Sequence, residues 1–139
     1  CKRESGDDEY YLIDPNAGCG YESPYLDYAK LLQSLHGGYE LLQNVMEVEI
    51  NLNQINYIYI NSDKYGKLLE LFTEYIRNKF GVQGLASIYV HELVHWLRLM
   101  PYKIIKDEKN AVIYFARMII IWQEIMGFCE EENEKISYF

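Results

Sequence analysis

Residues 81–101 read GVQGLASIYVHELVHWLRLMP, and this stretch decides how the chain is expected to fold. Apolar residues dominate it after Gly84, and Glu92 is the one charged residue between Ile88 and Leu97. An apolar run of this length is typical of a helix that is mostly buried. We therefore expect a helix over about Leu85–Met100, which Pro101 ends because proline cannot continue the helical hydrogen-bond pattern.

Two further long helices are expected on either side of this stretch. Upstream, Ser62 or Asp63 is suited to cap a helix that reaches about Phe80, before Gly81 and Gly84 break the chain. Downstream, Asp107 and Glu108 favour the start of a last helix that reaches about Cys129, because acidic groups stabilise a helix N-terminus. The acidic tail, residues 130–139, is expected to fray.

The first half of the chain predicts one more helix, a short helix over Tyr39–Gln43 after it, and a hairpin. A helical repeat of apolar residues begins at Tyr25 and stops at Gly37-Gly38. Residues 46–52 then alternate apolar and polar, which indicates a half-buried strand, and Ile55–Asn61 is a second strand after a turn at Asn53-Gln54. The expected fold is α+β and mostly helical, with a small hairpin packed on the helix of residues 85–100 and on the long helix after it.

Length and composition indicate one domain. The chain has 139 residues, of which we expect 1–24 to be a tether or loop and 25–139 to form a single domain. The net charge of −8, with no concentration of Lys and Arg, argues against a nucleic-acid partner. No transmembrane segment is expected, because Arg117, Gln123 and Glu124 interrupt the apolar run Val112–Met126.

The three cysteines leave the cellular compartment open. Cys1, Cys19 and Cys129 are an odd number, so they cannot all pair within the chain. Cys1 is followed by a polar run and resembles the first residue of a mature bacterial lipoprotein, where it would carry a lipid anchor. That alternative would place the protein outside the cytoplasm, in a secreted or lipoprotein-like setting.

The sequence His91-Glu92-Leu93-Val94-His95 is the motif with a chemical meaning. Histidines four residues apart lie one above the other on a helix, so both imidazoles can bind one zinc ion. Glu92 is one position further round the helix, where its carboxylate could take a proton from a zinc-bound water. The motif therefore predicts metal-assisted hydrolysis, with His91 and His95 as ligands and Glu92 as general base.

The ten residues IYVHELVHWL, 88–97, resemble the extended HExxH signature of the zincin metallopeptidases. The resemblance implies a zinc metalloendopeptidase with a peptide or protein as substrate. In that family a helix and a sheet precede the motif helix, and an edge strand binds the substrate in extended form. Ile55–Asn61 is the strand expected to do so here.

A third zinc ligand is expected from the following helix. The metzincin branch is excluded, because Arg98 and Pro101 occupy the places of its glycine and third histidine. The gluzincin branch takes a glutamate, and Glu124 is the preferred candidate because it is the only acid between Ala111 and Cys129, where the helix is otherwise largely apolar. Glu131 and Glu108 are the alternatives. His36, just before Gly37-Gly38, is interpreted as a residue at a helix C-terminus.

Two other functions remain open on the sequence alone. The chain could be an inactive or self-inhibited zincin-fold protein that binds or regulates a partner. It could also be a structural helical protein whose histidines bind nothing. The presence of Glu92 favours the active enzyme over both.

Overall fold

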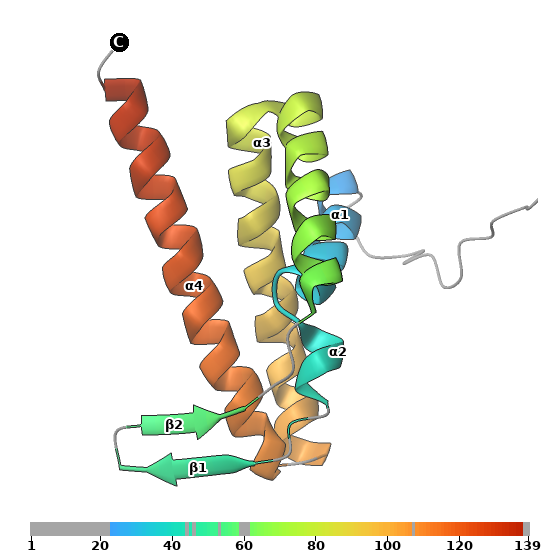
Figure 1. The fold of residues 1–139 in the computed structure, drawn as a ribbon, viewed down its shortest axis with the longest axis vertical. Coiled ribbons are helices and arrows are strands. Elements are labelled where there is room, and N and C mark those ends of the chain that lie inside the picture. The colour runs from blue at the N-terminus through green and yellow to red at the C-terminus, as the bar shows by residue number, and fades with distance from the viewer. Residues whose placement is uncertain are drawn as a thin grey trace, which may run out of the picture.

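The computed structural model describes residues 23–43, 45, 47–52, 54–58, 62–106 and 108–137 (Figure 1). Within these, the side chains of residues 108–109 and 131–137 are outside the description. The elements follow in the order α1 (Pro24–Leu35), α2 (Tyr39–Leu42), β1 (Val48–Asn51), β2 (Gln54–Tyr57), α3 (Asp63–Lys106) and α4 (Glu108–Ser137). The prediction of a mostly helical chain with one small hairpin is confirmed. Cys1, Cys19 and nearly all of the predicted tether lie outside the described residues.

The helix α3 is a pair of antiparallel arms joined at one glycine. Gly81 has φ 71° and ψ −178°, a backbone conformation that favours glycine. The first arm (residues 63–80) and the second arm (82–106) lie side by side in Figure 1, and Ile76 of the first packs with Leu85 and Ile88 of the second. The predicted break at Gly81 is confirmed.

The predicted break at Gly84 is wrong, because Gly84 lies inside the helical second arm. Glycine is required here because the backbone lies close to Phe80, and a Cβ at this position would overlap the Cβ of Phe80. The glycine therefore lets the chain pack tightly just after the reversal.

Pro101 does not end the helix, contrary to prediction. The second arm continues through Pro101 to Lys106. Proline removes the N–H that would bond the carbonyl of Leu97, but Leu97 is on an exposed face, where water can satisfy that carbonyl. A solvent-facing proline is thus tolerated in the last turns.

The last helix is longer than predicted. It begins at Glu108 as expected but ends at Ser137, so the expectation that residues 130–139 fray is wrong for residues 130–137. Glutamate and lysine are good helix formers, and the segment EEENEKIS continues the helix without a glycine or proline.

The hairpin is shorter than predicted. β1 and β2 pair antiparallel with Asn51 opposite Gln54 and Val48 opposite Tyr57, so Gln54 belongs to a strand and not to the turn. Residues 59–61 of the predicted second strand lie outside the described residues. Val48 and Tyr57 pack against the core cluster that contains Trp96, which attaches the hairpin to α3 and α4.

Two core clusters meet along the second arm of α3. The first cluster joins α2, α3 and α4 around Trp96, which is fully buried. The second joins α1 to both arms of α3 around Leu32, Ile76 and Ile88. Tyr89 packs against both clusters, so the residues next to it in sequence lie where all four long helical segments converge.

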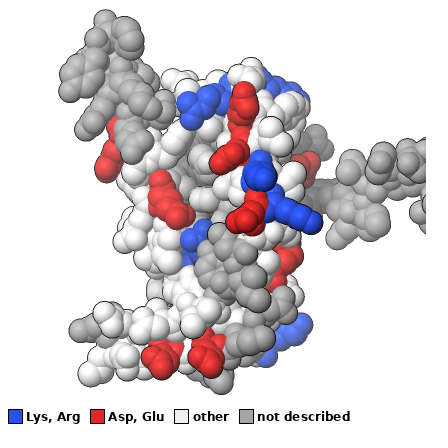
Figure 2. All heavy atoms as spheres, viewed as in Figure 1, with Lys and Arg blue, Asp and Glu red and all other residues white. Residues whose placement is uncertain are grey.

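On the face shown in Figure 2, acidic and basic side chains are spread over the surface with large uncharged areas between them. Several apolar side chains of α3 and α4 are substantially exposed, among them Leu97, Trp122 and Met126. The surface therefore includes apolar areas that the fold itself does not cover.

Candidate metal centre

His91 and His95 lie one helical turn apart on the second arm of α3 and are partly exposed. The Nδ1 of His91 is 2.7 Å from the backbone carbonyl of Ser87, so it is the donor and Nε2 is the acceptor nitrogen. The Nε2 of His95 is 3.0 Å from the carbonyl of Leu26 and donates to it, which leaves Nδ1 as the acceptor. Each imidazole therefore offers one nitrogen lone pair.

Both imidazoles face α1. The ring of His91 makes an edge contact with Tyr25, with 6.2 Å between centroids. Burial lowers the pKa of His95, although its hydrogen bond to Leu26 acts in the opposite direction. A lowered pKa favours the neutral imidazole at physiological pH, and this is the form that binds metal ions.

Glu92 points to another part of the bundle. Its side chain is completely buried, and its Oε2 accepts a hydrogen bond from the Nδ1 of His36 at 2.8 Å. Its Oε1 accepts a longer hydrogen bond, 3.4 Å, from the indole nitrogen of Trp96. Both carboxylate oxygens thus have partners on the side of the helix that faces the core.

His36 is the centre of this polar cluster. It is the C-cap of α1, which confirms the interpretation of His36 as a residue at a helix C-terminus. Its Nε2 lies 3.2 Å from Oε2 of Glu124, so the ring donates to one carboxylate from each nitrogen and carries a positive charge. Burial lowers the pKa of His36, but the hydrogen bonds and charges of Glu124 and Glu92 outweigh it and raise the pKa to about 9.

Arg117 joins the cluster to the loop after α1. Its guanidinium donates to the carbonyls of Gly37 at 3.2 Å and of His36 at 2.7 Å, and one nitrogen lies 3.8 Å from Glu124. The hydrogen bond from His36, with a further effect of the Arg117 charge, lowers the pKa of Glu124. Glu92, His36, Glu124 and Arg117 therefore form one ion-pair network that links α1, α3 and α4.

The network decides how well these residues fit a zinc ion. Each imidazole suits a metal ion in one respect, because a backbone carbonyl accepts from one ring nitrogen and leaves the other as an acceptor. The carboxylates do not fit as placed, since Glu92 and Glu124 face His36. In the part of the chain that is described, no group of three or more His, Cys, Asp or Glu residues is arranged to hold a metal.

The predicted ligand set of His91, His95 and Glu124 is therefore not brought together. The carboxylate of Glu124 contacts His36 and Arg117, whereas the two motif histidines face α1. The side chains of the alternative ligands, Glu108 and Glu131, lie outside the described residues.

Sequence reasoning missed His36 and Arg117 as partners of the motif. A usable signal was present in α4, where Arg117 is the only basic residue and Glu124 the only acid between Ala111 and Cys129. Residues seven apart share one face of a helix, so this pair marks a polar strip on an otherwise apolar surface. The position of the partner strip on α1 and α3 could not be read from spacing.

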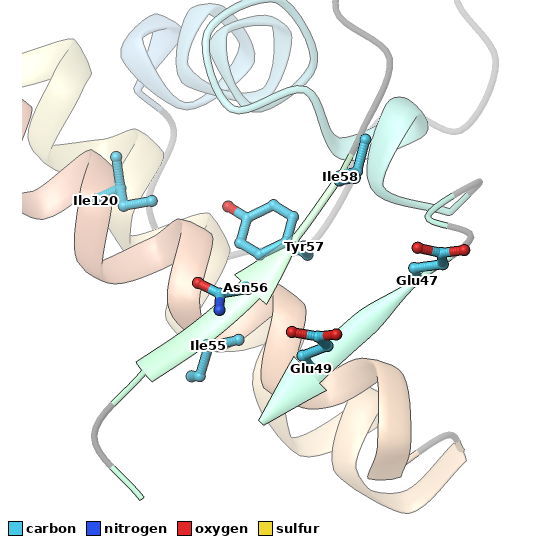
Figure 3. A pocket seen from close by; sticks show the side chains of 7 residues that line it. All are labelled: Glu47, Glu49, Ile55, Asn56, Tyr57, Ile58 and Ile120. Atoms are coloured by element: carbon cyan, nitrogen blue, oxygen red, sulfur yellow. The ribbon is translucent and has the colours of Figure 1, made fainter. Parts of the chain in front are cut away.

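A groove lies beside the hairpin (Figure 3). It has a volume of about 460 Å³ and is lined by residues in or next to β1 and β2 and by one residue of α4, namely Glu47, Glu49, Ile55, Asn56, Tyr57, Ile58 and Ile120. Four consecutive residues from Ile55 to Ile58 contribute, so the groove follows β2 and the residue after it. The motif residues 91–95 do not line it.

The charge of His36 makes stability depend on pH. The folded-state pKa of about 9 is above the ordinary value of 6.5, so the stabilisation is complete below about pH 6.5 and is lost as the pH rises through about 9. The loss is on the order of 3 kcal/mol. Tyr89, which contacts His36, does not interfere, since burial raises its pKa to about 12.

Urea unfolding between about pH 6 and about pH 10 checks this expectation. The His36→Gln variant should lose most of the decline over the same range. An equally steep decline in that variant would assign the pH dependence to another group.

A comparison with protein-family models, with curated proteins and with solved structures finds no match to this chain.

Proposed function

We propose that the protein is a zinc-dependent peptidase of the zincin type, with the metal held by His91 and His95. The observation that carries the proposal is the pair of partly exposed imidazoles four residues apart on one helix, each with one ring nitrogen bound to a backbone carbonyl and the other left as an acceptor. Two histidines oriented by carbonyls on their other nitrogens are the common arrangement of protein zinc ligands. The zincin assignment itself rests on the sequence around the motif.

Zinc bound there would supply a water molecule with a pKa near neutrality. Glu92 could act as the general base there only if its carboxylate exchanged its contact with His36 for one at the metal site. Glu124 can serve as third ligand only if it likewise leaves His36 and Arg117. The ion-pair network is therefore the part of the molecule that controls whether the proposed chemistry can proceed.

The proposed substrate is an extended peptide or an accessible segment of a protein. The groove along β2 is suited to a peptide that pairs with the strand through its main chain. Because the motif residues do not line this groove, the peptide would have to continue beyond it to reach His91 and His95. Glu47 and Glu49 at the groove favour basic side chains, while the isoleucines offer apolar contacts. A hydrolysis assay should therefore use a mixed pool of peptides that includes lysine- and arginine-containing sequences.

The second candidate function is binding or regulation of a partner by an inactive or self-inhibited zincin-fold protein. A specific observation favours it: both oxygens of Glu92 already accept hydrogen bonds inside the core, from His36 and Trp96. A carboxylate held in this way is part of the packing. Inactive and self-inhibited forms share this arrangement and differ in whether the contact with His36 can open.

Zinc binding tests the first step of the proposal. We expect one zinc ion per chain by calorimetry and elemental analysis, and a roughly hundredfold weaker affinity for His91→Ala or His95→Ala. His36→Gln, which removes the one histidine outside the motif, should bind zinc with the affinity of the unchanged chain. Equal affinities for all four proteins would exclude the motif as the metal site.

Unchanged zinc stoichiometry and affinity in Glu124→Ala would remove Glu124 from the ligand set.

Hydrolysis separates the two candidate functions. The zinc-loaded chain should cleave a mixed peptide pool, and both a chelator and Glu92→Gln should abolish cleavage at a temperature at which the variant stays folded. Stoichiometric zinc without any cleavage would favour the binding protein.

A further inference from the structure

The helix α4 carries more apolar surface than the fold buries. Tyr114, Ile121 and Ile125 are buried against the second arm of α3. The residue after each of these is also large and apolar but about half exposed, and these three are Phe115, Trp122 and Met126. Their spacing of seven and four residues places them in one line along the helix.

The second arm of α3 repeats this arrangement. Tyr89, Leu93 and Trp96 pack in the cluster shared with α4. The residue after each of these three is exposed and apolar. Lys103 likewise contacts α4, because its amine lies over the ring of Tyr114, and the next residue, Ile104, is again exposed and apolar. The exposed line on α3 is Val90, Val94, Leu97 and Ile104.

The two lines lie on the same face of the α3–α4 pair. The second arm of α3 and α4 run antiparallel (Figure 1), so moving one residue forward along either helix turns toward the same side. Moving one residue back leads to the opposite side, where Glu92 on α3 and Glu124 on α4 both reach His36 of α1. The exposed lines therefore form one apolar face directed away from α1.

This face, defined by Val90, Val94, Leu97, Ile104, Phe115, Trp122 and Met126, is large enough for a stable interface. Its side chains are between 40% and 54% exposed. Seven half-exposed side chains of this size offer on the order of 600 Å² of apolar surface, near the roughly 800 Å² per partner of a standard protein interface. None of the seven is charged.

We propose that this face pairs with the same face of a second copy of the chain. Two helices with apolar residues at intervals of three and four can interlock with an identical pair about a two-fold axis. An apolar face of this size needs a partner that is likewise apolar, and a second copy of the chain presents such a face.

A lipid bilayer is the competing occupant. The stretch Asn110–Glu130 of α4 is long and apolar enough to cross a membrane by length and composition. The remainder of the helix surface argues for a protein partner, because Arg117 and Glu124 bind the loop and helix end of α1. The net charge of −8 also opposes contact with anionic lipid headgroups.

Sedimentation velocity over micromolar to submillimolar concentrations tests the pairing. The unchanged chain should form a dimer, and Trp122→Glu and Leu97→Glu should each raise its dissociation constant roughly tenfold or more. Leu71→Glu is the matched control, since Leu71 is 65% exposed on the first arm of α3, outside the apolar face. All three substituted side chains are accessible in the single chain, so far-UV circular dichroism should show unchanged folding.

Three results would overturn the proposal. One is a chain that stays monomeric at every concentration. Another is a dimer that Leu71→Glu weakens as much as Trp122→Glu does. The third is a monomer that binds phosphatidylcholine vesicles through the apolar face, with binding lost in Trp122→Glu, which would assign the face to lipid.

Discussion

Replacing Glu92 with Gln is expected to lower the free energy of unfolding by about 3 kcal/mol, apart from any effect on hydrolysis. Glu92 is fully buried, and its Oε2 lies 2.8 Å from the charged ring of His36. Removing one partner of a buried pair leaves the other charge without full compensation. The effect falls at the low end of the usual range, because Glu124 still holds the second ring nitrogen.

Glu124→Gln is the matched control for this result, since the same substitution then removes the other carboxylate from the same imidazole. Glu124 is 46% exposed, so water can replace it and the expected loss is about 1 kcal/mol or less. Urea unfolding of both variants at neutral pH measures the difference. Equal losses would show that burial of Glu92 has no particular energetic role.

The proposed hydrolysis assay has to separate a loss of cleavage from a loss of folding. Glu92→Gln is the natural inactivating substitution for a motif of this type, yet in this fold it also removes an interhelical ion pair. An inactive variant would carry information about catalysis only where its circular dichroism and melting curve show that it is folded. The double substitution His36→Gln with Glu92→Gln would measure how strongly the two side chains are coupled.

Replacing Trp96 with Ala is expected to be the more damaging change, lowering the free energy of unfolding by about 4 kcal/mol. Its side chain is fully buried between α2, α3 and α4, with ring contacts to Tyr39 and Tyr114 at 6.3 and 6.2 Å. It also lies against Gly37, where an added Cβ would overlap the indole. Alanine would leave a cavity beneath the loop that holds His36 in place.

Trp122→Ala provides the comparison for this loss. Trp122 is about half exposed on the outer side of α4, so truncating it should cost about 1 kcal/mol in the single chain. Thermal and urea unfolding of both variants, at concentrations where the chain is monomeric, measure the difference. Comparable losses at the two tryptophans would contradict the assignment of Trp96 to the core.

Local patterns predicted the elements of this fold well. The arms of α3, the start of α4 and the hairpin all follow from the spacing of apolar residues and from glycine punctuation. The errors at Gly84 and Pro101 have a common cause, because both residues break helices only when their surroundings do not compensate. Gly84 stays helical at a place where a side chain would collide with Phe80, and Pro101 stays helical on a solvent-facing side of the helix.

The spacing of His91 and His95, and with it the possibility of a shared metal ion, was determined by the sequence alone, since neighbours one turn apart need no information from the remainder of the chain. The partner of Glu92 was decided only by the tertiary structure. His36 is 56 residues earlier in the chain and reaches Glu92 because α1 packs against both arms of α3. Helical periodicity specifies which side chains share a face, whereas the packing of helices distant in sequence specifies what that face meets.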